Sequence, residues 1–172
     1  HYAVDADHAS ALAALEIAGA GLQEGEWDCA LAGGVSELLT PVELAAYAAC
    51  GALSPSGRLR PFAADADGTL LGEGAALFAL KRLDDAVRDG DTVLAVVRAI
   101  ASAAPPATAR AHAPDAEVIA AAIFEAWRAA GLAPGDARLF ECHAGGVLAA
   151  DAAEVAALRS LVAAGARPVA LG

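Results

Sequence analysis

Short apolar runs alternate with helical segments along the whole chain, and this alternation constrains the fold more than any other feature of the sequence. Trp27–Ala32 and Val93–Ile100 are almost continuously apolar, which is typical of strands buried on both faces. Ala9–Leu22 and Ala116–Ala130 instead repeat apolar residues at helical spacing. Strands that alternate with helices predict an α/β protein with a mainly parallel sheet.

The other elements are predicted from the same patterns. A short strand ends at Val4 or Asp5, with Asp7 as the N-cap of the first helix, and Asp151 caps the last helix. In chain order, the expected helices are 9–22, 41–49, 81–88, 116–130 and 151–163, and the later strands are 27–32, 75–80, 93–100, 138–142 and 168–171. Gly33-Gly34 is expected to permit a close approach of another segment.

Two segments lack this periodicity. Gly51–Gly74 contains five glycines and two prolines, and a long irregular segment inside a domain is usually an ordered loop or a functional one. Ala101–Ala113 is rich in alanine and proline and is predicted to be a surface loop. We also expect Arg58 and Arg60 to pair with nearby acids.

Composition and charge exclude several classes of function. The net charge of −11 argues against nucleic acid as a partner and gives no support for binding to a membrane surface. No apolar run is long enough to span a bilayer, and the first residues do not resemble a signal peptide, so we predict a cytoplasmic location. The three cysteines have no metal-binding spacing and are predicted to be reduced, buried thiols. The acids at 65, 67 and 73 lack the EF-hand spacing, so no metal site is expected.

His8 is the first candidate for a functional residue. It lies in a tight turn between a strand-like run and a helix, where free backbone N–H groups and the positive end of the helix dipole would stabilise an anion. A nucleophile suits this position. A neutral imidazole there can accept a proton, but His8 can also merely fill the position, and both interpretations stay open.

Several stretches together resemble the β-ketoacyl synthase family, the condensing enzymes of fatty-acid and polyketide synthesis. Gly51–Gly74, followed by Leu80-Lys81-Arg82-Leu83, resembles the family's GALSP-DGR-x-x-PF-x-x-x-ADG-x-x-x-GEG block. Glu141–Gly146, with Asp151 and Glu154, is similar to the family's EAHGTGT…GD-x-x-E motif. Here Ala144, Gly145 and Val147 replace Gly, Thr and Thr, which removes two hydroxyls that could fix the loop.

The resemblance implies a thiolase-like fold with α-β-α-β-α layers, built from two similar halves and usually dimeric. Residues 1–172 would form a central portion of a ketosynthase-like domain, with 1–74 ending the N-terminal half and 75–172 beginning the C-terminal half. Because such a portion would leave apolar surface and strand edges uncovered, we expect it to be poorly stable alone.

The resemblance also assigns roles to residues. The family uses a nucleophilic Cys, two catalytic His residues and a Lys. Aligning Val4–Leu12 with the family's VDTACASSL pattern places His8 at the position of the Cys, and His143 falls on the first catalytic His. The second His and the Lys would lie beyond Gly172. No cofactor is expected, because substrates would arrive on the phosphopantetheine arm of an acyl carrier protein.

Three hypotheses of function follow. The first is a ketosynthase-like domain that does not condense and acts as a structural or dimerisation partner, as chain-length factors do, in a homo- or heterodimer. The second is a malonyl-carrier-protein decarboxylase. The third is an active β-ketoacyl synthase, an acyltransferase, with His8 as a natural or introduced replacement.

Overall fold

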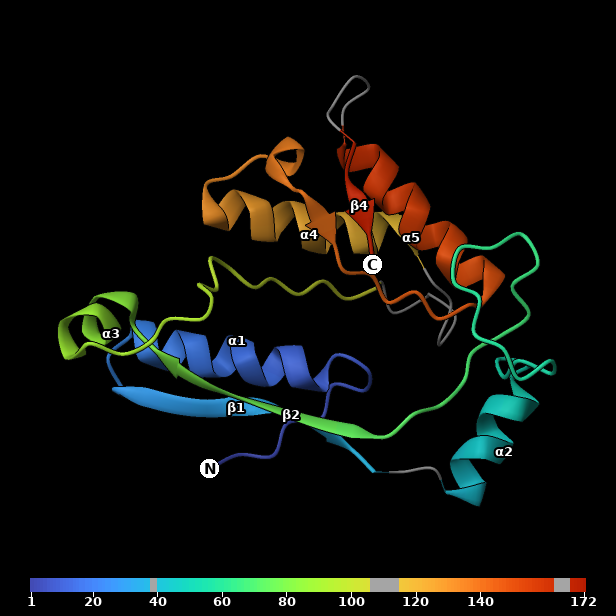
Figure 1. Cartoon of the computed structure of the whole chain (residues 1–172), viewed down its shortest axis with the longest axis horizontal. Coiled ribbons are helices and arrows are strands. Elements are labelled where there is room, and N and C mark those ends of the chain that lie inside the picture. Colours follow the sequence, from blue (N-terminus) through green and yellow to red (C-terminus); the bar gives the residue numbers. More distant parts are fainter. Residues whose placement is uncertain (38–39, 106–114, 163–167) are drawn as a thin grey trace. The chain divides into compact units, whose positions relative to one another are not determined.

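A computed structural model describes residues 1–37, 40–105, 115–162 and 168–172, which belong to two compact units (Figure 1). The first unit consists of His1–Leu38 and Glu73–Ile100, and the second of Leu39–Gly72 and Ala101–Gly172. Each unit is described separately. Residues 106–113 of the expected loop and the end of the last expected helix lie outside the described residues.

The first unit is a helix packed on a two-stranded ribbon. Its elements are α1 (Ser10–Gln23), β1 (Cys29–Ser36), β2 (Gly74–Lys81) and α3 (Leu83–Asp89). β1 and β2 pair antiparallel over their full length, and α1 packs mainly on β1 (Figure 1). At Gly34, a β-carbon would lie 2.8 Å from the Cβ of Ala11 in α1. The predicted close approach at the glycine pair is therefore confirmed.

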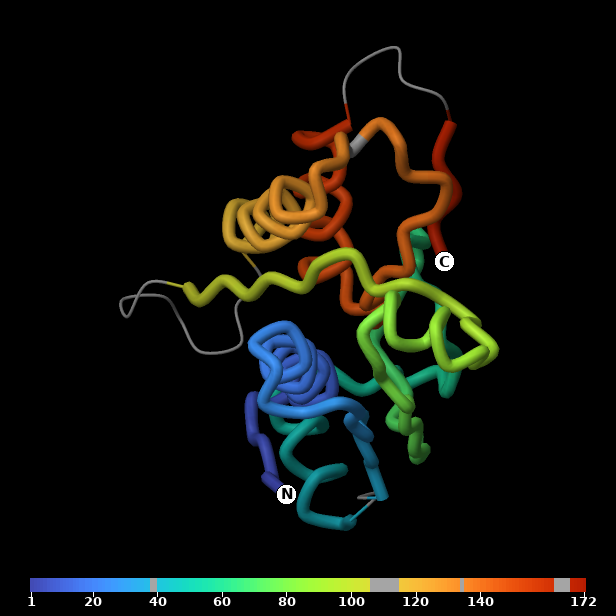
Figure 2. Tube along the Cα trace, turned by 90° about the vertical axis from the view of Figure 1, so that its left-hand side faces the viewer, coloured from blue at the N-terminus to red at the C-terminus, as the bar shows by residue number. Residues whose placement is uncertain are grey.

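Three predictions fail in the first unit. Val93–Ile100 is not part of a strand, although Figures 1 and 2 show it as extended chain. The run ending at Val4 or Asp5 is not a strand either; only Ala6 forms an isolated bridge, with His8. The expected mainly parallel pairing is wrong here, since the longer of the two ladders in the described residues is antiparallel.

The second unit holds the remaining helices and a short parallel ladder. Its elements are α2 (Pro41–Ala49), α4 (Ala116–Ala130), the 3-10 turn η1 (Pro134–Asp136), β3 (Leu139–Phe140), α5 (Leu148–Leu161) and β4 (Ala170–Leu171). β3 pairs in parallel with β4, and α4 packs against α5, as Figure 2 shows. The rings of Trp127 and Phe140 meet edge to face, with centroids 6.5 Å apart.

Local signals explain the ends of these helices. Thr40 caps α2 by accepting the N–H of Glu43, with proline at the first helical position. Asp115 caps α4, and Gly131 ends it in a left-handed conformation (φ 66°). The prediction that Asp151 caps the last helix is wrong. α5 begins at Leu148, so Asp151 lies inside its first turn.

Few large side chains are buried. The buried apolar residues of the described chain are mostly alanines: Ala18, Leu22, Ala32, Ala66, Ala86, Ala137, Ala157 and Leu158. Much of the high apolar content of the chain is alanine, which contributes little buried area to a core.

Candidate active site

His8 lies in a tight hydrogen-bonded turn directly before α1. Ser10 Oγ accepts the N–H of Ala6 at 2.9 Å and donates to the carbonyl of Asp7 at 2.6 Å. Asp7 has a left-handed backbone (φ 53°) and does not cap the helix; the N-cap position is held by Ala9, without a side-chain hydrogen bond. The predicted turn is therefore confirmed, and the predicted Asp7 cap is wrong because Ser10 closes the turn instead.

The imidazole of His8 is open to solvent. Its side chain is 63 % exposed, and Nε2 lies 3.9 Å from the Asp7 carboxylate. At the head of α1 it meets the positive end of the helix dipole. The position is suited to a group that becomes negatively charged. An imidazole side chain is either neutral or positively charged, so it does not supply such a group.

His143 lies in the loop between β3 and α5, and the backbone of this loop is fixed by a carboxylate of α5. Glu154 accepts the N–H of His143 at 2.7 Å and the N–H of Ala144 at 3.1 Å. Ala144 has a left-handed backbone, with φ at 50°. Because Glu154 binds two consecutive N–H groups, the loop keeps its shape without the hydroxyls that the sequence lacks.

Asp151 fixes the same loop from its other end. The side chain is buried, with the residue 4 % exposed, and Oδ1 accepts the N–H of Gly146 at 3.1 Å. Oδ2 accepts the N–H of Phe62 at 2.7 Å. Asp151 therefore joins the His143 loop to the irregular segment of the chain.

The ring of His143 lies against Gly145. A β-carbon built on Gly145 would be 3.2 Å from His143 Nε2 and 3.3 Å from Cδ2, which is tighter than ordinary van der Waals contact. The threonine of the family pattern at this position would therefore push the ring by a few tenths of an ångström. The glycine permits the present position of the ring.

The Gly51–Gly74 segment is ordered by a polar cluster. Ser54 is buried and donates to Asp67 at 2.6 Å, and this hydrogen bond, more than Arg60, lowers the pKa of the Asp67 carboxyl. Arg60 pairs with Asp67 at 3.1 Å and with Asp65 at 2.9 Å, so its predicted pairing with acids is confirmed. Arg58 is exposed and forms no ion pair with an acid of the described residues, so the same prediction is wrong for Arg58. The irregular segment is thus an ordered loop, as the sequence indicates.

The three cysteines are free thiols, but their predicted burial is wrong for two of them. Cys29 and Cys50 are exposed, because β1 is covered on one side only and no residue of α2 is buried. Cys142 is half-buried, and burial raises the pKa of its thiol.

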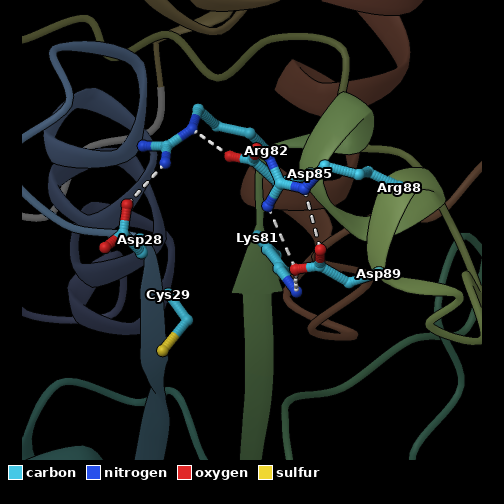
Figure 3. Close-up of a pocket in the computed structure, with 7 residues that line it drawn as sticks. All are labelled: Asp28, Cys29, Lys81, Arg82, Asp85, Arg88 and Asp89. Carbon is cyan, nitrogen blue, oxygen red and sulfur yellow. Dashed lines mark hydrogen bonds and ion pairs between the residues drawn. The ribbon is translucent and has the colours of Figure 1, made fainter.

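A hollow beside the β1–β2 ribbon is lined by charged residues rather than by the candidate site (Figure 3). Its members are Asp28, Cys29, Lys81, Arg82, Asp85, Arg88 and Asp89. Arg82 donates to the carbonyls of Leu22 and Trp27, and its guanidinium also pairs with acids on both sides. It thereby joins the turn after α1 to the start of α3.

The same hollow has its charges compensated. Lys81 reaches Asp89 at 2.6 Å, and Arg88 binds Asp85 and Asp89 (Figure 3). Lys81 also reaches Asp91, at 2.7 Å. Arg88 first, then Lys81, lowers the pKa of Asp89 to about 2. Each cation of the hollow is matched by carboxylates, so the cluster has a structural role and is not an anion site. The ion pairs of Lys81 and Arg88 with Asp85 and Asp89 are called the clasp below.

The structure places the two predicted site residues in different units, His8 in the first and His143 in the second. Sequence reasoning assigned no anchoring role to Asp151 and Glu154, although both stand in the motif after His143. The signal was their spacing, because acids three residues apart on a helix lie on one face and can reach one loop. Within the described residues, no group of three or more His, Cys, Asp or Glu could hold a metal ion, and no helix is both long and apolar enough to cross a membrane.

Comparison with known proteins identifies the family of the chain. The family description "Beta-ketoacyl synthase, N-terminal domain" matches residues 1–86, and "Beta-ketoacyl synthase, C-terminal domain" matches residues 94–172. A mycocerosic acid synthase-like polyketide synthase of Mycolicibacterium smegmatis is 43 % identical over 155 residues, which are 90 % of this chain and 7 % of that protein. A phenolphthiocerol/phthiocerol polyketide synthase of Mycobacterium tuberculosis is 42 % identical over 170 residues, 99 % of this chain and 11 % of that protein.

Solved structures give the same fold. The oxazolomycin ketosynthase domain OzmH KS7 of Streptomyces albus superposes with a TM-score of 0.89 at 34 % identity, over 95 % of this chain and 30 % of that one. The ketosynthase of module 6 of the bacillaene synthase from Bacillus subtilis gives a TM-score of 0.85 at 31 % identity, over 89 % of this chain and 28 % of that one. The chain belongs to the β-ketoacyl synthase family and corresponds to part of a thiolase-like ketosynthase domain of the kind found in polyketide synthases. It spans about a tenth of the length of these polyketide synthase relatives.

Proposed function

We propose that this chain belongs to a ketosynthase-like domain that does not carry out condensation and serves as a structural or dimerisation partner, as chain-length factors do. The observation that carries the proposal is His8 at the head of α1, and the proposal takes this position to be that of the family's nucleophilic Cys. A cysteine there forms a thioester that can pass its acyl chain on. An acyl-imidazole hydrolyses easily and is a poor store for a growing chain.

The test restores the nucleophile. His8→Cys is introduced into the full-length product of the gene, and an acyl thioester of a carrier protein is supplied. We expect no acylation of the unchanged protein, and an acyl adduct on residue 8 of the variant, read by peptide mass spectrometry. His8→Ser is the matched control, since a serine hydroxyl is a weaker nucleophile than a cysteine thiolate. A stable acyl adduct or a condensation product from the unchanged protein would overturn the proposal.

A second candidate is a malonyl-carrier-protein decarboxylase, and the fixed backbone of the His143 loop favours it. Decarboxylation needs no nucleophilic Cys: the malonyl thioester loses CO₂, and its enolate takes a proton to give the acetyl thioester. A hydrogen bond from His143 to the thioester oxygen would stabilise the negative charge of the enolate. Glu154 binds the backbone N–H of His143, so the ring extends from a fixed point of the chain.

This candidate has its own measurement. Malonyl-carrier protein is incubated with the full-length protein, and acetyl-carrier protein is followed by mass spectrometry. We expect His143→Ala to lower any decarboxylation by about 10²-fold or more, and His8→Ala to change it little. Equal rates with and without His143 would reject the decarboxylase.

The assignment of partners belongs to the same proposal. An acyl carrier protein would deliver substrates on its phosphopantetheine arm, and a second ketosynthase-type subunit would complete a homo- or heterodimer, in the cytoplasm. A solved structure of similar fold, at 24 % identity, is a complex of a type II polyketide synthase acyl-carrier protein with its ketosynthase (AntDE:AntF). The division into halves at 74/75 also remains a proposal.

A further inference from the structure

The strained backbone positions of the second unit share one feature: each donates its N–H to a carboxylate of α5. Among the described residues of this unit, Phe62 (φ 59°) and Ala144 (φ 50°) are the non-glycine residues in the left-handed region. Phe62 donates to Asp151 and Ala144 to Glu154. Such conformations are costly for a residue with a side chain and persist only where the surroundings fix them.

Gly146 is held from both sides. Its N–H binds Asp151 Oδ1, and its carbonyl accepts the N–H of Gly68 at 3.0 Å. Gly146 itself is left-handed (φ 72°), and a β-carbon on it would lie 2.7 Å from the Gly68 carbonyl oxygen. The irregular segment therefore touches the His143 loop directly at Gly68, and through Asp151 at Phe62.

Asp151 is the group that binds both segments, at the strained residue Phe62 and at Gly146. Its two oxygens are divided between Phe62 and Gly146, residues that lie 84 positions apart in the chain. If one donor moved away, the buried carboxylate would be left partly unsatisfied, which costs free energy. Displacing one of the two segments without the other is therefore unfavourable.

We propose that Asp151 is a positioning residue for His143: by binding Phe62 and Gly146 at once, it couples the conformation of the irregular 51–72 segment to that of the His143 loop. A displacement of Phe62 then changes the position and orientation of the His143 ring. The coupling is independent of whether the domain condenses, decarboxylates or does neither, because it concerns the ring itself.

The test is the reactivity of His143 in the full-length protein. Asp151→Asn keeps the size of the side chain but replaces one acceptor oxygen by an NH₂ group. Carbethoxylation by diethyl pyrocarbonate is followed by peptide mass spectrometry, with His8 in the other unit as the internal reference. We expect the rate at His143 to change at least threefold, and the rate at His8 to stay within 1.5-fold. Glu117→Gln, at an exposed acid in the first turn of α4, should change neither rate.

Two outcomes would overturn the proposal. One is a His143 rate within 1.5-fold of the unchanged protein, and the other is an equal change at both histidines, which would indicate general loosening. Should Asp151→Asn fail to fold, amide hydrogen exchange of the unchanged protein decides. The N–H groups of Phe62 and Gly146 should be protected and should open at the same rate, within about twofold. An unprotected Phe62 N–H would contradict the coupling.

Discussion

Gly68 occupies a position that no other residue can take without displacing the backbone. Its φ is 138°, and an added β-carbon would lie 2.5 Å from the Leu53 carbonyl carbon and from the Ser54 nitrogen. Gly68→Ala should therefore destabilise by about 2 kcal/mol or more, because backbone atoms cannot give way as a flexible side chain can. The thermal unfolding midpoint of the full-length protein measures this.

Gly72 is the matched control for this substitution. It lies in the same segment, and a β-carbon there meets nothing within 4 Å. Gly72→Ala should stay within about 0.5 kcal/mol of the unchanged protein. Equal losses at the two glycines would show that the close approach at Gly68 does not determine the conformation of the segment.

At the residue scale, the sequence predicts local features, such as turns and close approaches, better than it predicts the partners of individual side chains. The glycine pair before the irregular segment and the turn at His8 were predicted from local spacing, which depends on neighbours in the chain. Asp151 was predicted as a helix cap because capping is the commonest local role for an acid there. Its partner Phe62 is 89 residues away, and no local pattern predicts such a contact.

At the scale of elements, α4 offers a direct test of capping. Asp115 Oδ1 accepts the N–H of Glu117 at 2.9 Å and of Val118 at 3.4 Å. Asp115→Ala should cost about 1 kcal/mol, because two N–H groups at the start of the helix lose their acceptor. Asp115→Asn keeps an acceptor and should recover most of this loss. Similar thermal midpoints for the two variants would argue against a capping role.

The clasp of β2 and α3 predicts a dependence of stability on pH. The pKa of Asp89 is about 2 instead of its ordinary 3.8, since Arg88 and Lys81 favour the charged carboxylate. A lowered pKa contributes stability that is complete above about pH 4 and is lost as the pH falls towards 2. Asp89→Asn should therefore make the fall of the urea midpoint between pH 5 and pH 2 shallower.

The control for the clasp is Asp84, an exposed acid in the first turn of α3. It takes part in none of the ion pairs of the described residues, so Asp84→Asn should leave the acid dependence nearly as steep as before. If Asp84→Asn reduced the fall of the urea midpoint at low pH as much as Asp89→Asn, the ion pairs would not be the cause of the pH dependence.

Helices were predicted more accurately than strands for a physical reason. A helix satisfies its own backbone hydrogen bonds, so apolar spacing and capping residues were enough to predict α2 and α4. A strand needs a partner, and the sequence does not specify which segment supplies it. Val93–Ile100 has the composition of a strand but belongs to neither ladder of the described residues, while β1 and β2 pair with each other.

At the scale of the whole molecule, the chain exposes more surface than a protein of its size normally does. Its accessible surface is 11865 Å² for a mass of 17.0 kDa. A single folded protein of that mass averages about 7,700 Å², and two separate bodies of half the mass would expose about 9,300 Å² together. Leu94 is 94 % exposed and Leu31 76 %, so much of the excess is apolar.

The 172 residues expressed alone should therefore be poorly stable. Exposed apolar surface provides no stabilisation to offset the conformational entropy lost on folding, and unpaired strand edges favour association. We expect binding of the dye ANS, association at micromolar concentration and no cooperative thermal transition, measured by fluorescence, light scattering and calorimetry. The full-length protein is the control and should unfold cooperatively with little ANS binding. A monomeric 172-residue chain with a sharp transition of about 0.7 kcal/mol per residue would contradict the prediction, since such an enthalpy requires a packed core.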